Sequence, residues 1–131
     1  MTSSKILAIG FFLTALAVIL GAFGAHALKQ SVSPIQLDVY KTGVQYHFYH
    51  AIGIVCVGLL AQLFPNLNGL KTVVYLFVLG IICFSGSLYA FTFEEAAGIS
   101  KSFWLGIITP LGGLFFISAW LLLAYGQWKS R

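Results

Sequence analysis

Long apolar stretches separated by short polar segments dominate the chain. Four stretches contain no Asp, Glu, Lys or Arg: residues 6–28, 42–70, 72–93 and 102–128. Each exceeds the roughly 20 residues that an α-helix needs to cross the hydrocarbon core of a bilayer. Backbone groups in lipid must be hydrogen-bonded within the segment, and no long polar–apolar alternation favours strands. Each stretch is therefore predicted to be a transmembrane helix.

The connections between the stretches predict how the helices are arranged. We expect helices over about 6–28, 42–64, 72–93 and 102–125. The second and third are joined by the turn-forming segment 64–69, and the third and fourth by a short polar link. Short links place successive helices antiparallel. The sequence thus predicts an all-α membrane protein with a single domain, residues 1–131, formed by an antiparallel bundle of four transmembrane helices.

A helix start precedes the second stretch. Ser33 is placed as the N-cap, Pro34 as the first helical residue and Gln36 as the third, a pattern typical of a helix N-terminus. A helix is therefore expected from residue 34, ahead of the membrane. Gly43 either marks a bend between an interfacial helix and the span, or one long helix projects from the bilayer.

The first stretch has some features of a signal peptide. Lys5 precedes the apolar run, and Ala25-His26-Ala27 resembles a cleavage site with small flanking residues. However, the run is longer than the roughly 7–15 apolar residues of a signal peptide. We therefore expect it to be a transmembrane helix.

Composition and charge agree with a membrane protein. Hydrophobic residues make up 60% of the chain and charged residues 8%, whereas soluble domains have about 25% charged residues. The net charge of +4 does not indicate nucleic-acid binding, because the basic residues are scattered singly. The lipid bilayer is thus the expected surrounding.

The distribution of basic residues predicts the orientation. One side of the membrane would carry four of them and the other side three, together with all three acidic residues. Because cytoplasmic loops are enriched in Lys and Arg, both termini are predicted to be cytoplasmic. The two sets are Lys5, Lys71, Lys129 and Arg131 against Lys29, Lys41 and Lys101.

Polar side chains from all four predicted helices fall at a similar depth. At 1.5 Å per residue, they lie in the half of the bilayer nearest the 29–41 and 94–101 segments. His26 is expected to point into the bundle and to pair with a residue of the second or third helix. We treat this polar layer as the candidate binding site: His26, Tyr46, His47, His50, Ser85, Ser87, Tyr89 and Thr109.

Helix packing offers a simpler explanation for many of these positions. Small residues let helices approach closely, and hydroxyl groups bond across helix interfaces. Pro110 cannot donate to the carbonyl of Gly106, so a kink is expected there. Cys56 and Cys83 are interpreted as small buried hydrophobic residues. The positions assigned to helix packing are Gly21, Gly24, Gly86, Pro110, Gly112 and Gly113.

The three histidines allow further chemistry. Ionisable residues within membrane helices usually face the bundle interior or water. They could hold a metal, a haem or a quinone, or relay protons. No cysteine or carboxylate joins them, however, and no acid is placed to orient a histidine for acyl transfer. We therefore expect no catalytic residues, no metal site and no cofactor.

Several motifs in order resemble one known family. They are Gly21-Ala22-Phe23-Gly24-Ala25-His26, Thr42-Gly43 with Tyr46 and His50-Ala51, Phe84-Ser85-Gly86-Ser87-Leu88-Tyr89, and Thr109-Pro110-Leu111-Gly112-Gly113 with Trp120. Together they resemble the domain-of-unknown-function 423 family of small integral membrane proteins. The resemblance implies a four-span protein of the bacterial inner membrane and brings no established activity. At position 47 this family more often has Gln, which leaves His26 and His50 as the better-supported histidine pair.

Two functions remain open. One is a non-enzymatic membrane protein that serves as an accessory or assembly subunit of a larger membrane complex, with other membrane proteins as partners. The other is binding or transport of a small molecule, an ion or a proton through the polar layer.

Overall fold

Four long helical segments form the described part of the chain. The computed structural model describes residues 1–129, and within them four segments are long and apolar enough to cross a membrane. Arg131, which entered the orientation count, lies outside the described residues. The elements in chain order are α1 (Ser3–His26), η1 (Leu28–Gln30), α2 (Pro34–Leu63), α3 (Leu70–Gly80), η2 (Ile81–Ser85), α4 (Gly86–Ala96) and α5 (Phe103–Lys129). The predicted all-α fold with four apolar helices packed together is confirmed.

The second helix begins as its sequence predicts. The Ser33 side chain accepts a hydrogen bond from the backbone N–H of Gln36 at 3.2 Å, with Pro34 in the first turn. The helix then runs for 30 residues without a break at Gly43, which corresponds to about 45 Å. The interfacial segment and the span are therefore one helix that extends beyond the hydrocarbon core.

The third span contains a π-helical turn. Elements α3, η2 and α4 follow one another without a loop, and η2 covers Ile81–Ser85 with π-type hydrogen bonding. The N–H of Gly86 bonds to the carbonyl of Ile81, five residues earlier. A π turn inserts one residue into the helical repeat and so rotates the following residues around the axis. Which residues of α4 face α2 and α5 depends on this insertion.

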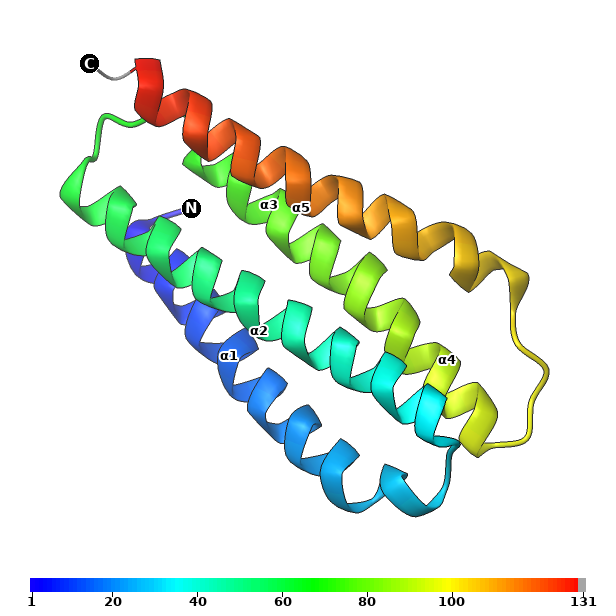
Figure 1. The fold of residues 1–131 in the computed structure, drawn as a ribbon. Coiled ribbons are helices and arrows are strands. Elements are labelled where there is room, and N and C mark those ends of the chain that lie inside the picture. The colour runs from blue at the N-terminus through cyan, green and yellow to red at the C-terminus, as the bar shows by residue number, and fades with distance from the viewer. Residues whose placement is uncertain (130–131) are drawn as a thin grey trace.

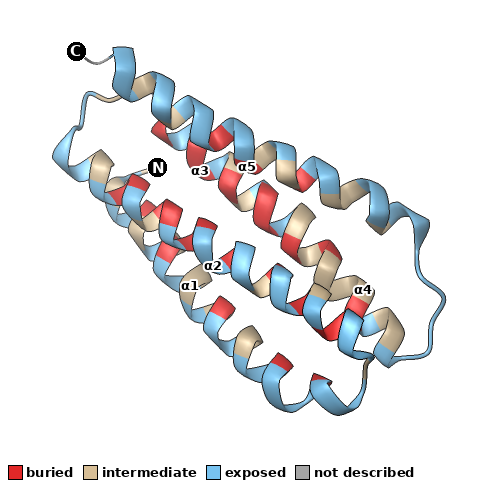
Figure 2. Cartoon of the chain, viewed as in Figure 1, coloured by how far each residue is buried: buried red, intermediate tan, exposed pale blue. Residues whose placement is uncertain are grey.

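Helices that are consecutive in the sequence form the most extensive contacts. Figure 1 shows α1 alongside α2 and the third span alongside α5, and these pairs share the most extensive contacts. Contacts between α2 and the third span join the two pairs. In the most apolar stretch of α1 and of α5, 17% of the residues are buried, against 39% in α2 and 44% in the third span. Figure 2 shows the same contrast, so α1 and α5 are the outer helices.

The main hydrophobic core lies where α2, α3 and α5 meet. Its wholly buried side chains include Ile54, Val57 and Phe77, with Ile6 from α1 and Phe116 from α5. A smaller cluster of Leu28, Leu37 and Tyr40 closes the other end of the α1–α2 pair. The two hydrophobic clusters thus lie on either side of the section that contains the polar layer.

Aromatic residues near both ends of α5 agree with a membrane position. Trp104 is 72% exposed and Trp128 is 85% exposed. The two lie 24 positions apart, or about 36 Å along a helix. Tryptophan is enriched at the two interfaces of a bilayer, so this spacing suits a helix that crosses the membrane.

α5 continues as one α-helix across Pro110, whose side chain is exposed, and the kink expected there stays a prediction. One expectation needs correction. Cys56 is exposed rather than buried, while Cys83 is partly buried, and both are free thiols. Because a thiol is small and weakly polar, it is tolerated on a lipid-facing surface as well as in a core.

Candidate functional site

His47 and Tyr89 form a buried polar pair between α2 and α4. The imidazole Nδ1 and the phenolic oxygen are 3.1 Å apart, and His47 is only 2% exposed. The close approach of the two helices at Gly43 makes room for the Tyr89 ring, because a Cβ at Gly43 would lie 3.0 Å from its Cε1. In the tautomer protonated at Nε2, the Tyr89 hydroxyl donates to Nδ1.

His50 is held by its own helix and by aromatic rings. Its Nδ1 donates to the carbonyl of Tyr46 at 2.7 Å. The imidazole also stacks on the ring of Phe116 in α5, with centroids 3.4 Å apart and an angle of 7° between the planes. Since a carbonyl oxygen can only accept, this contact fixes the proton of the neutral ring on Nδ1.

Ser87 and Thr109 link α4 to α5. Their hydroxyl oxygens are 2.6 Å apart. Ser87 also contacts the carbonyl of Phe84 at 2.8 Å, and Thr109 that of Leu105 at 2.8 Å. Both hydroxyls therefore have partners within the protein, as expected for polar groups in a membrane helix interface.

Two buried polar atoms have no hydrogen-bond partner among the described residues: Nε2 of His47 and Oγ of Ser85. Ser85 is wholly buried at the end of the π turn. The backbone of Leu13 in α1 lies near the His47 ring but forms no hydrogen bond with Nε2. Unpaired buried polar groups destabilise a fold by about 1–3 kcal/mol, so these two atoms are the unusual feature of the site.

The prediction that His26 points into the bundle is wrong. The residue is exposed at the last turn of α1, and within residues 1–129 its ring makes no hydrogen bond to another side chain. Its neighbour Gly24 faces α2 and is buried. Residues two apart on an α-helix point about 200° from each other, so a helix that buries Gly24 turns His26 outward. At this depth a polar ring can reach the headgroup region.

Tyr46 lies at the edge of the layer. It is 40% exposed, and its ring packs against Phe84 with centroids 4.7 Å apart. The predicted layer is thus several separate contacts rather than one network. These contacts join α2, α4 and α5. His26 of α1 takes no part in them.

The positions assigned to helix packing divide into two groups. A Cβ at Gly24 would lie 2.7 Å from Cδ1 of Tyr40, and a Cβ at Gly112 would lie 2.7 Å from Cα of Phe84. At Gly21 it would meet Val44 at 3.3 Å. A Cβ at Gly86 would meet only its own helix, at 3.9 Å, and at Gly113 nothing lies within 4 Å. Close contact with another helix is therefore found at the first three positions.

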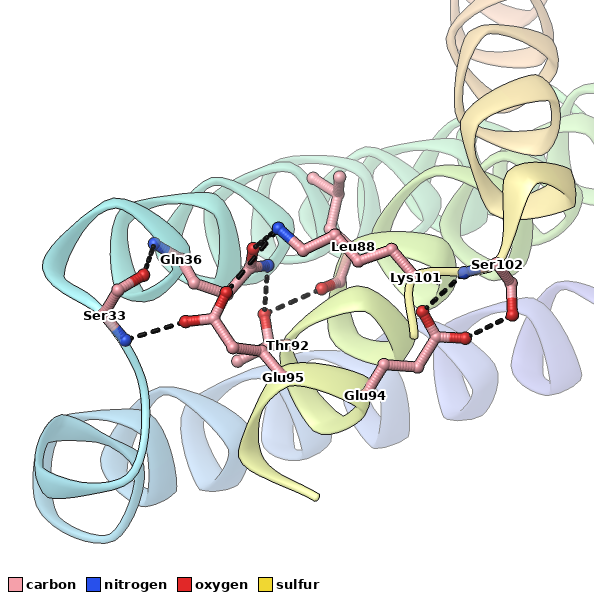
Figure 3. Close-up of polar contacts among 8 residues, drawn as sticks. All are labelled: Ser33, Gln36, Leu88, Thr92, Glu94, Glu95, Lys101 and Ser102. Atoms are coloured by element: carbon pink, nitrogen blue, oxygen red, sulfur yellow. Dashed lines mark hydrogen bonds and ion pairs between the residues drawn. The ribbon is translucent and has the colours of Figure 1, made fainter. Parts of the chain in front are cut away.

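A second polar cluster, which we call the clasp, joins the start of α2 to the end of α4. Figure 3 shows its residues. The carboxylate of Glu95 accepts from the N–H of Ser33 at 2.8 Å and lies 3.6 Å from the ammonium of Lys101. Buried Gln36 donates to Thr92 at 3.1 Å and accepts from Lys101 at 3.2 Å. The clasp therefore joins α2, α4 and Lys101 through hydrogen bonds and an ion pair.

The clasp also extends to the start of α5. Glu94 accepts hydrogen bonds from the N–H and the hydroxyl of Ser102, the N–H at 3.0 Å. The adjacent acids Glu94 and Glu95 therefore both contact the α5 end of the link between α4 and α5, through Ser102 and Lys101, and Glu95 also holds the start of α2.

Some buried polar residues were not singled out from the sequence. Tyr40 is wholly buried, packs against the tilted ring of Tyr89 with centroids 5.1 Å apart, and donates to the carbonyl of Leu20 at 2.8 Å. Thr92 is wholly buried as well. Tyr40 covers Gly24 of the preceding helix. The sequence around Tyr40 itself does not indicate this contact, so its burial could not be predicted locally. Gln36 was noted only for its capping position.

The chemistry available to the site is limited. Across residues 1–129, no group of three or more His, Cys, Asp or Glu side chains is placed to hold a metal ion. His47 and His50 each contact a different partner, and the acidic residues lie in or near the clasp. The arrangement offers hydrogen bonds to a small polar ligand and close helix packing.

Fold and site together define the class: a small four-helix integral membrane protein with a polar interior. Sequence comparison identifies the family. The family model described as "Protein of unknown function (DUF423)" matches residues 20–113, and the chain belongs to this family of membrane proteins. The resemblance noted from the sequence motifs is confirmed.

Bacterial relatives match most of the chain. UPF0382 membrane protein YwdK of Bacillus subtilis is 42% identical over 114 residues, covering 87% of this chain and 88% of the relative. A UPF0382 membrane protein of Haemophilus influenzae is 39% identical over 122 residues, covering 93% and 89%. UPF0382 inner membrane protein YgdD of Escherichia coli is 30% identical over 114 residues, covering 87% and 82%. No solved structure matches the chain.

Proposed function

We propose that this protein is a non-enzymatic protein of the cell's inner membrane that acts as an accessory or assembly subunit of a larger membrane complex. The observation that supports this function is a groove on the outer side of α1 and α2, with a volume of about 560 Å³. Its α1 wall is made largely of small residues: Ala17, Gly21, Ala22, Gly24 and Ala25. Small residues allow a neighbouring membrane helix to approach closely.

The polar layer supports a non-enzymatic role. Most of its hydroxyl and imidazole groups are used in hydrogen bonds between or within helices. Within residues 1–129, neither His47 nor His50 forms a hydrogen bond or ion pair with a carboxylate that could orient its ring for nucleophilic or general-base catalysis. The inner-membrane location rests on the name of the Escherichia coli relative.

Co-purification tests the subunit proposal. The tagged full chain would be isolated in mild detergent and analysed by quantitative mass spectrometry, beside the variants Ala22→Leu and Ala15→Leu. Ala22 lines the groove, whereas Ala15 is exposed on the same helix and does not line it. We expect one stoichiometric membrane partner with the original chain and with Ala15→Leu, and its loss with Ala22→Leu. A chain isolated without a partner contradicts the proposal.

We further propose that both termini are cytoplasmic. The end of the molecule that holds Lys5, Lys71 and Lys129 has no acidic side chain among the described residues. A C-terminal fusion to alkaline phosphatase, which is active only outside the cytoplasm, should be inactive, and a fusion to a fluorescent protein should be bright. The reverse pattern would invert the assignment.

The unpaired atoms favour a second candidate function, binding or transport of a proton or small polar molecule. His47 Nε2 and Ser85 Oγ are buried polar groups with unused hydrogen-bonding capacity. Proteoliposomes containing a pH-sensitive dye would report proton flux. Flux that disappears in His47→Gln but persists in His26→Gln would support this function, and equal flux in both variants would reject it.

A further inference from the structure

A cleft with both polar and apolar residues in its wall lies at the opposite end of the molecule from the clasp. It is formed where the loop between α2 and α3 meets the last turns of α5, and its volume is about 520 Å³. Several hydrogen-bonding side chains line it: Asn66, Asn68, Thr72, Tyr125 and Lys129. The cleft is not part of the polar layer, and its inference is independent of the subunit proposal.

Charge is distributed very unevenly between the two ends. All three acidic residues lie at the clasp end, where Lys41 pairs with Asp38 at 3.2 Å and Lys101 pairs with Glu95 at 3.6 Å. At the cleft end, Lys5, Lys71 and Lys129 have no acidic partner among residues 1–129. Among residues 1–129, the basic side chains at the cleft end therefore carry positive charge without an acidic partner.

The backbone adds donors at the same place. α3 begins beside the cleft, and its N-cap is Gly69, which has a φ of 86° and provides no side chain to cap the helix. The first N–H groups of a helix have no partner within it and carry the positive end of the helix dipole. Together with Lys129 and the hydroxyl of Thr72, they present donors to a single acceptor-rich group.

The depth of the cleft matches lipid headgroups. Tyr125 lines it and is 63% exposed, and Trp128, one turn further along α5, is 85% exposed. Exposed Tyr and Trp residues are enriched at the interface between hydrocarbon and water. The phosphate groups of lipids in the adjacent leaflet lie at this level.

We propose that this cleft binds the phosphate of an anionic phospholipid headgroup. Lys129 provides the positive charge, and Asn68, Thr72 and the first turn of α3 provide hydrogen bonds. Basic sites beside membrane helices recognise anionic headgroups in this way. The apolar residues Leu70, Leu122 and Leu123, which also line the cleft, contact the start of an acyl chain.

Native mass spectrometry of the full chain tests the proposal. The protein would be released from detergent in the presence of phosphatidylglycerol or of phosphatidylcholine with the same acyl chains. We expect phosphatidylglycerol to be retained preferentially, and Lys129→Gln to weaken its binding about fivefold, the effect of one basic residue near an anionic surface. Lys5→Gln removes the same charge at the same end but outside the cleft, and should leave binding unchanged.

Two results would overturn the proposal. Equal retention of the two lipids would show that the cleft does not recognise headgroup charge. An equal loss in Lys5→Gln and Lys129→Gln would show a general attraction to the surface instead of a site. Thr72→Val, which keeps the shape and charge, should also weaken phosphatidylglycerol binding if the hydroxyl contacts the phosphate. An unchanged affinity would show that the Thr72 hydroxyl does not contact the phosphate.

Inorganic phosphate distinguishes a lipid from a soluble ligand. If millimolar phosphate does not displace phosphatidylglycerol, the lipid assignment stands. If phosphate alone binds and displaces the lipid, and Lys129→Gln weakens both, the cleft is a site for soluble phosphate and the lipid assignment is wrong.

Discussion

At the residue scale, single positions of the last turns of α1 decide what faces the neighbouring helix. The sequence showed that small residues and a histidine occur together near residue 24, but it did not show which of them faces α2. Gly24 does, because it lies under the ring of Tyr40, and His26 consequently points away. Assigning both residues to one face was inconsistent with 3.6 residues per turn, so this part of the site was predictable in principle.

We predict that Gly24→Leu destabilises the protein by about 1–3 kcal/mol, the usual effect of overpacking. A Cβ at this position already lies within 2.7 Å of Cδ1 of Tyr40. The midpoint of thermal unfolding in detergent measures the effect. Gly113→Leu is the matched control, because nothing lies within 4 Å of its added Cβ. If both variants unfold at the original midpoint, the α1–α2 contact does not limit stability.

His47 and His26 should differ sharply in their contributions to the stability of the protein. Tyr89→Phe leaves Nδ1 of buried His47 without its partner and should cost about 1–3 kcal/mol. His26→Ala removes an exposed ring and should change stability by less than about 0.5 kcal/mol. Unfolding by a graded denaturant in the same detergent would compare the two. If His26→Ala had the larger effect, the result would indicate that His26 lies inside the bundle after all.

At the element scale, helix positions and starts were predictable, whereas the partners of the helix ends were not. Length and hydropathy located all four spans, and the Ser33 cap followed from local rules. Gln36, expected only at a capping position, instead bonds to Thr92 in α4. Glu95, 62 residues away, accepts from the Ser33 N–H. Contacts between distant segments, like the π turn of η2, leave no local pattern in the sequence.

The role of Glu95 predicts a local effect on α2. In Glu95→Ala, the Ser33 amide loses its acceptor, and its hydrogen exchange should become faster together with that of the first turn of α2. Hydrogen–deuterium exchange with peptide-level mass spectrometry measures this. Asp38→Ala removes an exposed ion pair of the same helix and should leave the Ser33 amide unchanged. No acceleration in Glu95→Ala would mean that the clasp does not hold the end of the helix.

At the scale of the whole molecule, the polar interior is divided into separate pairs, which bears on cofactors. Imidazoles are the only strong metal ligands in the polar layer, and within residues 1–129 no three ligand side chains come together. We predict that the purified protein contains no haem and no tightly bound transition metal. Absorbance spectra and elemental analysis check this, and one equivalent of iron, copper or zinc per chain would refute it.

The arrangement of the helices also has a consequence for how the protein is made. α1 packs mainly on α2, and the third span packs mainly on α5, so each extensive interface joins consecutive segments. Contacts of low sequence separation form quickly, since little chain entropy is lost in bringing their partners together. The first hairpin is complete when Leu63 has left the ribosome and before α3 has emerged from it. The chain can therefore enter the membrane as two successive hairpins, with the clasp between α2, α4 and the start of α5 formed last.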